Sequence, residues 1–233
     1  MPNIIVPEDV QVISFDLDDT LWSSHQVISH AEQTMQNWMA QHTPLVTSQL
    51  SQDELRDKKF HFIKQNPQLA NKISLARQTF LHQLFQELGY EQAESLAQEC
   101  FQVFYEARQQ VILFDDVLDS LNELKQDYRL IAITNGNADV NKTQLKDVFE
   151  FSLVAEAFSN PKPHRDIFEH ALERLECEAK SVLHVGDHPI HDMQGAHEVG
   201  MKTCWLDDGS RQWDLPFSAH LVIEHVRDLL QKD

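Results

Sequence analysis

The sequence has few cysteines, no long apolar run and little positive charge, and each shortage excludes a class of protein. Its three cysteines, Cys100, Cys177 and Cys204, lack paired spacing, which excludes a disulfide framework and a cysteine-type zinc site. No apolar run is long enough to cross a bilayer. The formal net charge of −18 argues against nucleic acid or an anionic membrane as the main partner.

What remains is the composition of a globular protein, with 42% hydrophobic and 24% charged residues among 233. The first ten residues, MPNIIVPEDV, contain no basic segment followed by an apolar one, so we expect no signal peptide. Unpaired cysteines are typical of a reducing compartment. We therefore expect a cytoplasmic protein.

Short apolar runs rich in β-branched residues predict six buried strands. Helical apolar periodicity lies between the later runs, and strand–helix alternation of this kind predicts an α/β fold. We expect a Rossmann-like parallel sheet with helices on both faces. The strands are expected at 10–17, 130–135, 151–157, 181–187, 202–206 and 220–224, and the helices at 116–125, 164–175, 191–199 and after 225.

The segment from about residue 26 to 110 has a different texture, because it shows almost no strand signal. Apolar residues recur at helical spacing, and Gly89 is a plausible helix stop after one such stretch. We therefore predict a core domain formed by residues 1–24 and 112–233, interrupted by a small helical domain at 25–111.

Polar side chains follow the predicted strands at the points where the strands end. In an open parallel sheet, ligands bind beyond the carboxyl ends of the strands, so these side chains would share one rim with a lysine that precedes a helix. The set is Asp16, Asp18, Asp19 and Thr20 after the first strand, Thr134, Asn135 and Gly136 after the second, Asp187 and Asp192 after the fourth, and Lys162.

Crowded carboxylates predict a hard cation at this rim, and Mg²⁺ prefers oxygen ligands of this kind. Asp16 and Asp187 could each supply an oxygen. If Asp16 attacks a phosphate monoester, a −1 group meets a −2 group, which costs about 8 kcal/mol at 4 Å and an effective dielectric constant of about 20. Mg²⁺ and Lys162 would offset that repulsion.

This chemistry gives each polar residue a candidate role on a small phosphorylated metabolite. Asp16 would become an aspartyl phosphate, and Asp18 would protonate the leaving oxygen and later activate water. Thr134 and Asn135 would donate hydrogen bonds to the phosphate, and Gly136 lies next to them. Asp192 could orient Lys162 or a metal-bound water.

The motifs resemble those of the haloacid dehalogenase-like hydrolases. Asp16-Leu17-Asp18-Asp19-Thr20 resembles their DxDxT signature, and Thr134 after an apolar strand resembles their second motif. Lys162-Pro163 resembles the third motif, and HVGDHPIHDMQGA, which contains Asp187 and Asp192, resembles the fourth. All four occur in order across both ends of the chain.

The resemblance implies a Mg²⁺-dependent phosphatase with a helical cap of the C1 class between the first two motifs. It implies that Asp18 offers its backbone carbonyl to the metal, while Asp19 and Thr20 brace the loop. Arg77 in the cap could meet the substrate, although a salt-bridged surface arginine is the alternative. One departure is His164-Arg165, where the family often has Asp-Pro.

The substrate and the reaction class stay open at this point. The motif flanks resemble bacterial flavin-pathway phosphatases, which implies FMN or 5-amino-6-(5-phosphoribitylamino)uracil as substrate. Alternatives are a sugar-phosphate phosphatase or phosphomutase, a haloacid dehalogenase, and a non-enzymatic phospho-acceptor module. A dehalogenase needs no metal, and a phospho-acceptor module has no use for Asp18 as a general acid.

Overall fold

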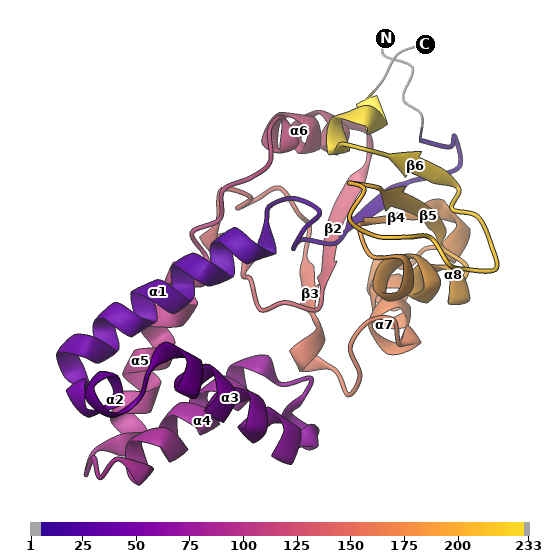
Figure 1. Ribbon diagram of the computed structural model, residues 1–233. Coiled ribbons are helices and arrows are strands. Elements are labelled where there is room, and N and C mark those ends of the chain that lie inside the picture. The colour runs from indigo at the N-terminus through magenta and orange to yellow at the C-terminus, as the bar shows by residue number, and fades with distance from the viewer. Residues whose placement is uncertain (1–5, 231–233) are drawn as a thin grey trace. The chain divides into compact units, whose positions relative to one another are not determined.

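Six parallel strands form one sheet in the computed structural model of the protein, which describes residues 6–230 (Figure 1). The strand order is β3-β2-β1-β4-β5-β6, which places β1 and β4 at the centre. The predicted α/β fold with a parallel sheet is confirmed. The strands are β1 (Val12–Phe15), β2 (Arg129–Thr134), β3 (Ser152–Val154), β4 (Val182–Gly186), β5 (Lys202–Leu206) and β6 (Leu221–Ile223).

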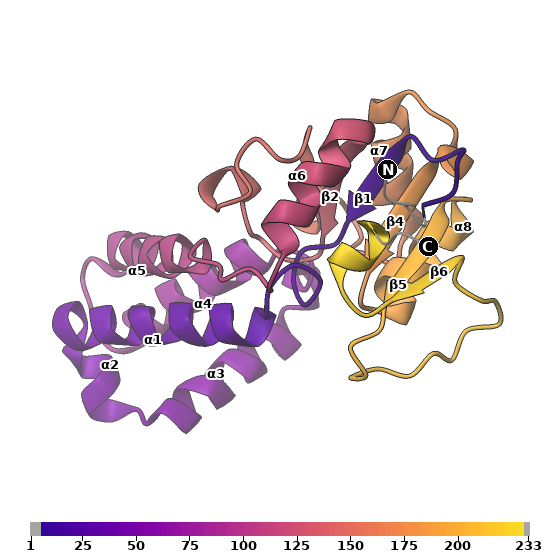
Figure 2. The same cartoon turned by 90° about the horizontal axis from the view of Figure 1, so that it is seen from above.

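Helices cover both faces of this sheet. The helix α6 (Val117–Asp127) lies with the short helix Val226–Leu230 on one face, and α7 (Arg165–Leu175) lies with α8 (Gly195–Glu198) on the other (Figures 1 and 2). β1 is completely buried, because it has neighbours on both edges and helices on both faces. Apolar side chains from the sheet, α7 and α8 form one core cluster, which includes Val12, Ile131, Ile133, Leu153, Ile167, Phe168, Ala171 and Ala196.

Two compact units make up the described chain. One contains the sheet and comprises the described residues through Ser24 and those from Val111, and the other is the helical segment His25–Gln110. The helical unit has its own apolar core of buried residues such as Met39, Phe85 and Phe104. Its helices are α1 (Ser24–His42), α2 (Pro44–Gln49), α3 (Gln52–Gln65), α4 (Ile73–Glu87) and α5 (Ala93–Arg108).

Local chemistry explains where several of these helices begin and end. Ser51 and Glu54 form a capping box at the start of α3, in which each side chain accepts a hydrogen bond from the other's backbone N–H. Gly89 follows α4 with a φ of 82°, a left-handed conformation that glycine adopts without steric cost. None of the helices within residues 6–230 is long and apolar enough to span a membrane.

Several predicted elements differ from the structure at their ends; the strand predicted at 10–17 spans Val12–Phe15, and the helix predicted after 225 is a 3-10 helix over Val226–Leu230. The strand predicted at 151–157 ends at Val154, because Ala155–Ala157 turn into a short 3-10 helix. The helix predicted at 191–199 begins earlier, as a π-helical turn over Pro189–Gln194 that continues into α8. The imidazole of His188 accepts hydrogen bonds from the first N–H groups of that turn and so starts it two residues before the predicted position.

Candidate active site

The strand register brings the motif residues to one edge of the sheet. Phe15 pairs with Ala132 of β2 and with Val185 of β4, so the residues that follow these strands emerge next to one another. The backbone N–H of Asp16 still donates to the carbonyl of Val185, at 2.8 Å. Asp16 is thus held by the sheet itself at the point where β1 ends.

Lys162 lies at the centre of this rim. Its Nζ is 2.6 Å from an oxygen of Asp16, 2.6 Å from an oxygen of Asp192, and 2.8 Å from the carbonyl oxygen of Ile133. Three acceptors satisfy the three donors of an ammonium group, and the lysine is only 2% exposed. One buried cation therefore bridges two buried carboxylates that come from different loops.

Asn135 fixes the backbone of Lys162. Its side-chain oxygen accepts from the N–H of Lys162 at 2.8 Å, and its side-chain nitrogen donates to the carbonyl of Lys162 at 3.1 Å. The structure thus gives the Asn135 amide a positioning contact, and the predicted contact between Asn135 and phosphate stays a prediction. Thr134 is buried, and its hydroxyl oxygen accepts from the N–H of Gly136 at 3.0 Å.

Asp192 is held from every side. One oxygen accepts from Lys162 and lies 3.4 Å from Nε2 of His184, and the other accepts from the N–H of His188 at 3.0 Å. A Cβ on Gly186 would lie 2.4 Å from Cγ of Asp192, so only glycine leaves room for the carboxylate here. Asp192 is therefore placed to orient Lys162.

The buried histidine behind Asp192 completes this network. Nδ1 of His184 lies 2.9 Å from the hydroxyl of Ser14, its partner in the strand register. Because an ionised carboxylate can only accept, Nε2 of His184 carries the proton toward Asp192, and Nδ1 accepts from Ser14. Burial lowers the pKa of His184, although Asp192 opposes that shift, which favours the neutral ring.

Burial and charge act in opposite directions on the central groups. Burial raises the pKa of Asp16 well above its usual range, and Asp192 and Asp187 add to the rise that Lys162 opposes. Burial also disfavours the charged form of Lys162 and of Asp192, but their attraction raises the pKa of the lysine and lowers that of the aspartic acid. For Asp16, the attraction of Lys162 therefore does not outweigh burial and the two neighbouring carboxylates, and its pKa stays raised.

Asp187 follows β4 and is engaged at both oxygens. One accepts from the hydroxyl of Thr20 at 3.3 Å, and the other accepts from Nε of Arg211 at 2.9 Å. Burial raises the pKa of Asp187 to about 6, and Asp192 adds to the rise, whereas Arg211 opposes it. The backbone carbonyl of Asp187 accepts from the indole N–H of Trp205 at 3.0 Å.

The loop after β1 gives its other two acids separate partners. The indole N–H of Trp22 donates to an oxygen of Asp18 at 2.8 Å. The carboxylate of Asp19 accepts from the N–H and the hydroxyl of Ser24, at 2.9 and 2.7 Å, and so caps the start of α1. Asp19 itself has a φ of 63°, a left-handed conformation that aspartate tolerates better than most residues.

The donor set fits a hard divalent cation. Asp16, Asp187 and Asp192 are buried, and each offers a carboxylate oxygen within 4.8 Å of the others. Both oxygens of Asp192 and both oxygens of Asp187 accept from protein donors, so hydrogen bonding alone does not rank these carboxylates as ligands. Oxygen ligands without thiolate or imidazole among them suit Mg²⁺.

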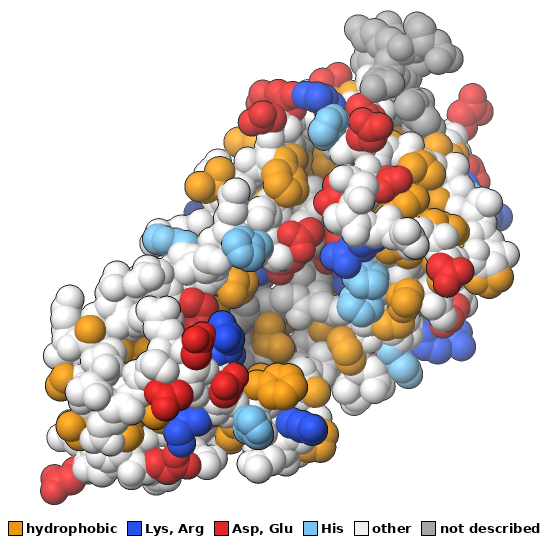
Figure 3. Space-filling model, in the orientation of Figure 1, with side chains coloured by type: hydrophobic (Ala, Val, Ile, Leu, Met, Phe, Trp, Pro, Cys, Tyr) orange, Lys and Arg blue, Asp and Glu red, His pale blue; other side chains and the backbone are white. Residues whose placement is uncertain are grey.

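These side chains line a hollow of about 170 Å³ in the sheet unit. That volume is below the roughly 300 Å³ of sites that enclose a whole drug-sized ligand, so the hollow suits a small polar group. Acidic and basic side chains are interspersed on the face of the molecule that Figure 3 shows. The hollow is lined by Asp16, Asp18, Asp19, Thr134, Asn135, Gly136, Lys162, Asp187, His188, His191, Asp192 and Arg211.

Arg77 lies within the helical unit. Its guanidinium is 2.8 Å from Glu32, which also pairs with Lys59 at 2.8 Å, and it stacks over the ring of Phe104. The predicted contact of Arg77 with substrate therefore stays a prediction, since the structure shows this arginine in an ion pair.

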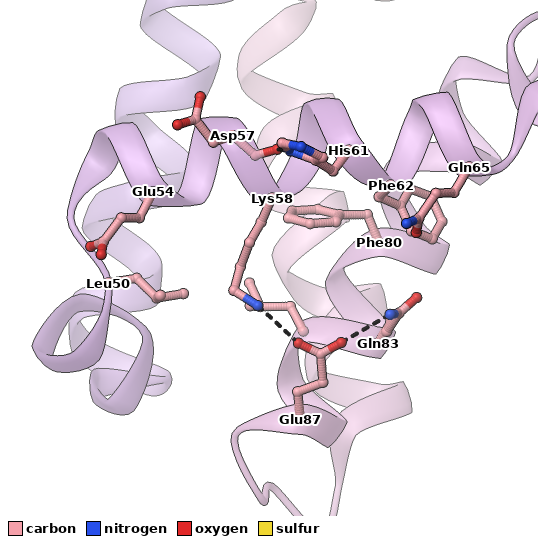
Figure 4. A pocket seen from close by; sticks show the side chains of 11 residues that line it. Leu50, Glu54, Asp57, Lys58, His61, Phe62, Gln65, Phe80, Gln83 and Glu87 are labelled. Carbon is pink, nitrogen blue, oxygen red and sulfur yellow. Dashed lines mark hydrogen bonds and ion pairs between the residues drawn. The ribbon is translucent and has the colours of Figure 1, made fainter.

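A larger hollow of about 470 Å³ lies between α3 and α4 of the helical unit. Lys58 forms an ion pair with Glu87, and Gln83 donates to the same carboxylate (Figure 4). The hollow has an apolar floor that includes Phe80. Among the described residues that line it, the one lysine is paired with Glu87, and there is no cluster of carboxylates around a buried cation like that of the sheet unit.

Sequence reasoning missed three residues of the site. Ser14 and His184 are polar residues in otherwise apolar buried strands. Ser14 lies two positions before Asp16 and His184 lies three before Asp187, and that signal could have identified them. Arg211 lies in an irregular segment between β5 and β6, where no pattern in the sequence distinguishes it from a surface arginine.

Comparison with protein families agrees with the motif order. Residues 10–200 match the haloacid dehalogenase-like hydrolases, a range that covers most of the chain and every site residue predicted from the sequence. The chain belongs to the haloacid dehalogenase-like hydrolase family.

Individual relatives within this family carry different activities in their names. The 5-amino-6-(5-phospho-D-ribitylamino)uracil phosphatase YigB of Escherichia coli is 29% identical over 94% of both chains. A solved structure titled 2-haloacid dehalogenase, from Pseudomonas syringae pv. Tomato, is 34% identical with a TM-score of 0.88, and covers 94% of this chain and 96% of that one. A glyceraldehyde 3-phosphate phosphatase of Pyrococcus abyssi is 34% identical over 49% of this chain and 51% of its own length.

Proposed function

We propose that this family member is a Mg²⁺-dependent phosphatase that hydrolyses a small phosphorylated metabolite through an aspartyl phosphate on Asp16. The observation that carries the proposal is the pairing of Asp16 and Asp192 through one buried lysine, beside a second carboxylate at Asp187. This arrangement places a buried lysine and candidate metal ligands around one nucleophile. The two phosphatase relatives support the same reaction class.

In the first half of the reaction, a carboxylate oxygen of Asp16 attacks phosphorus. The new oxygen–phosphorus bond forms as the bond to the ester oxygen breaks, and Asp18 gives its proton to that leaving oxygen. Lys162, 2.6 Å from Asp16, attracts the phosphate oxygens and orients the nucleophile. Thr134 and the backbone near Gly136 line the same hollow and are placed to hold the phosphoryl group.

In the second half, water attacks the phosphorus of the aspartyl phosphate. Asp18, now a carboxylate, takes a proton from that water, and the bond between phosphorus and Asp16 breaks to release inorganic phosphate. The hydrogen bond from Trp22 holds Asp18 in place through both halves. Asp192 and Asn135 keep Lys162 in position by binding its ammonium group and its backbone.

The site needs one more positive charge than its own lysine supplies. Burial and two neighbouring carboxylates raise the pKa of Asp16, yet Asp16 has to be ionised to attack. Mg²⁺, held by Asp16, Asp187 and the backbone carbonyl of Asp18, would supply charge that stabilises both the carboxylate and the transition state.

The substrate class follows from the relatives and from the size of the hollow. About 170 Å³ in the sheet unit suits a phosphoryl group and leaves the rest of the metabolite to be recognised elsewhere. We propose FMN or 5-amino-6-(5-phosphoribitylamino)uracil as the metabolite, in line with the relative YigB, with a sugar phosphate as the alternative. We further propose that the helical unit acts as the cap over this site, with Arg77 contacting substrate.

Phosphate release from p-nitrophenyl phosphate tests the mechanism. We expect Asp16→Asn and Asp18→Asn to lose at least about a thousandfold in activity. Asp119→Asn, on the exposed side of α6, is the control and should keep the wild-type rate. EDTA should abolish activity and Mg²⁺ restore it. A fully active Asp16→Asn enzyme, or a rate that EDTA leaves unchanged, would contradict the proposal.

A panel of phosphoesters tests the substrate separately. FMN, 5-amino-6-(5-phosphoribitylamino)uracil, glyceraldehyde 3-phosphate, hexose phosphates and nucleotides should be compared by kcat/KM. A preference for the two flavin-pathway compounds supports the narrower assignment. Equal activity on all of them would reject that assignment while the phosphatase mechanism stands.

A haloacid dehalogenase is the second candidate, because the structure titled 2-haloacid dehalogenase is 34% identical. In that reaction a carboxylate would attack carbon and expel halide, which needs no protonation of the leaving group. Asp18 and the acid cluster would then be dispensable. Chloride release from 2-chloropropionate that survives Asp18→Asn and EDTA would favour this candidate.

A further inference from the structure

Arg211 is a cationic residue of the site that none of the four motifs contains. It lies between β5 and β6, 24 positions after Asp187 in the chain, and its Nε donates to Asp187 at 2.9 Å. It also lines the hollow that contains Asp16 and Lys162. Its position brings a second fixed positive charge directly to a carboxylate that would bind metal.

The contact with Arg211 engages one of the two carboxylate oxygens of Asp187. The other oxygen of Asp187 already accepts from Thr20, so each carboxylate oxygen has a protein donor. Each oxygen keeps a second lone pair for a divalent cation, so the charge of the donors decides which of them conflicts with the metal. Thr20 carries no charge, whereas the guanidinium of Arg211 would repel a cation only a few ångströms away, so Arg211 is the donor that has to leave.

The backbone around Arg211 is anchored, while its side chain is free to move outward. Trp213 packs against Trp205 with ring centroids 5.2 Å apart, and Trp205 donates to the backbone of Asp187. Farther along, Phe217 stacks on His197 at 3.8 Å. The Arg211 side chain itself is 35% exposed, against 5% for Asp187, so it can reach solvent without moving the segment.

We propose that Arg211 is an internal competitor for Mg²⁺ at Asp187. In the metal-free protein it neutralises the buried carboxylate, and it swings into solvent when the metal binds. The inference rests on the proposed Mg²⁺ dependence of the enzyme. It assigns Arg211 the role of a positioning residue that sets how much metal the enzyme needs.

In competition of this kind, the apparent affinity for metal equals the intrinsic affinity multiplied by the fraction of molecules in which Asp187 is not paired with Arg211. A partly exposed ion pair contributes about 1 kcal/mol, which corresponds to about a fivefold change in a dissociation constant. Removing the guanidinium should therefore tighten metal binding about fivefold. A residue that helped to hold the metal would give the opposite sign.

Metal binding is measured directly, without turnover, on the full-length protein freed of metal. MnCl₂ is titrated into wild type, Arg211→Gln and Arg211→Met, and free Mn²⁺ is followed by electron paramagnetic resonance. Isothermal titration with MgCl₂ repeats the comparison. Arg227→Gln is the matched control, because Arg227 lies in the same unit and pairs with the exposed Asp116. Circular dichroism checks that each variant is folded.

We expect both Arg211 variants to bind Mn²⁺ about fivefold more tightly than wild type, and Arg227→Gln to bind within twofold of wild type. Unchanged or weaker binding in the folded Arg211 variants overturns the inference while the proposed function stands. If wild type binds neither Mn²⁺ nor Mg²⁺, and Asp187→Asn gives the same titration as wild type, the metal dependence in the proposed function fails. The inference then fails with it.

Discussion

Replacing Lys162 with methionine tests the central ion network most directly. Lys162 is 2% exposed, and its ammonium lies 2.6 Å from oxygens of both Asp16 and Asp192. Methionine preserves most of the volume but leaves two buried carboxylates without their shared cation. Breaking a buried ion pair by removing one partner costs about 3–5 kcal/mol, which lowers the Tm of a chain of this size by about 10 °C.

The loss of folding stability caused by Lys162→Met should depend on pH in a defined direction. Without Lys162, the pKa values of Asp16 and Asp192 both rise above those of the unfolded chain, because burial and mutual repulsion are no longer opposed. A group with a raised pKa binds its proton more tightly when folded, so folding is favoured as the pH falls. The difference in free energy of unfolding between wild type and Lys162→Met should therefore be largest near pH 8 and smaller near pH 5.

Thermal unfolding followed by circular dichroism at pH 5 and pH 8 measures both effects. Lys180→Met is the matched control, since Lys180 pairs with Glu178 on the surface, where both side chains are at least 70% exposed. It should change the free energy of unfolding by less than about 0.5 kcal/mol. If Lys162→Met unfolds like wild type at pH 8, or loses more stability at pH 5, the reasoning about this network is wrong.

The remaining predictions concern the groups around Lys162. Gly186→Ala should push the Asp192 carboxylate away, because the new Cβ would lie 2.4 Å from its Cγ, and kcat should fall while a crystal structure shows Asp192 displaced. Trp22→Phe removes the N–H that holds Asp18 and should lower kcat on an alkyl phosphate about tenfold. The decrease in kcat should be smaller on p-nitrophenyl phosphate, because its leaving group needs no proton. Asp19→Ala should lose about 1 kcal/mol of stability with the cap of α1, measured by urea unfolding.

Periodicity predicted the sheet well because the strands are buried on both faces. The short run at residues 181–187 is rich in valine and leucine, which indicates a buried strand, and the structure places β4 at Val182–Gly186. Boundaries were less certain where side chains determine them. The imidazole of His188 starts a π-helical turn at Pro189, which apolar spacing cannot reveal.

The sequence predicted the site residues near strand ends from the fold, and it predicted Lys162 and Asp192 from the motif order. Parallel strands bring their carboxyl ends together, so Asp16 and Asp187 could be expected to meet. Arg211 reaches Asp187 from a segment without regular structure, and no periodicity encodes that path. The contact of Asn135 with the backbone of Lys162 is equally invisible, since it depends on the conformation of two loops.

The three aspartates of the β1 loop differ in the chemistry of their partners, and that difference supports their proposed roles. Asp16 lies against the ammonium of Lys162, which favours its ionised form as a nucleophile requires. Asp19 binds backbone and hydroxyl donors of Ser24, which fixes it as a structural cap. Asp18 accepts from the indole N–H of Trp22, which orients its carboxyl group. A residue proposed to give and then take a proton needs a fixed orientation of this kind.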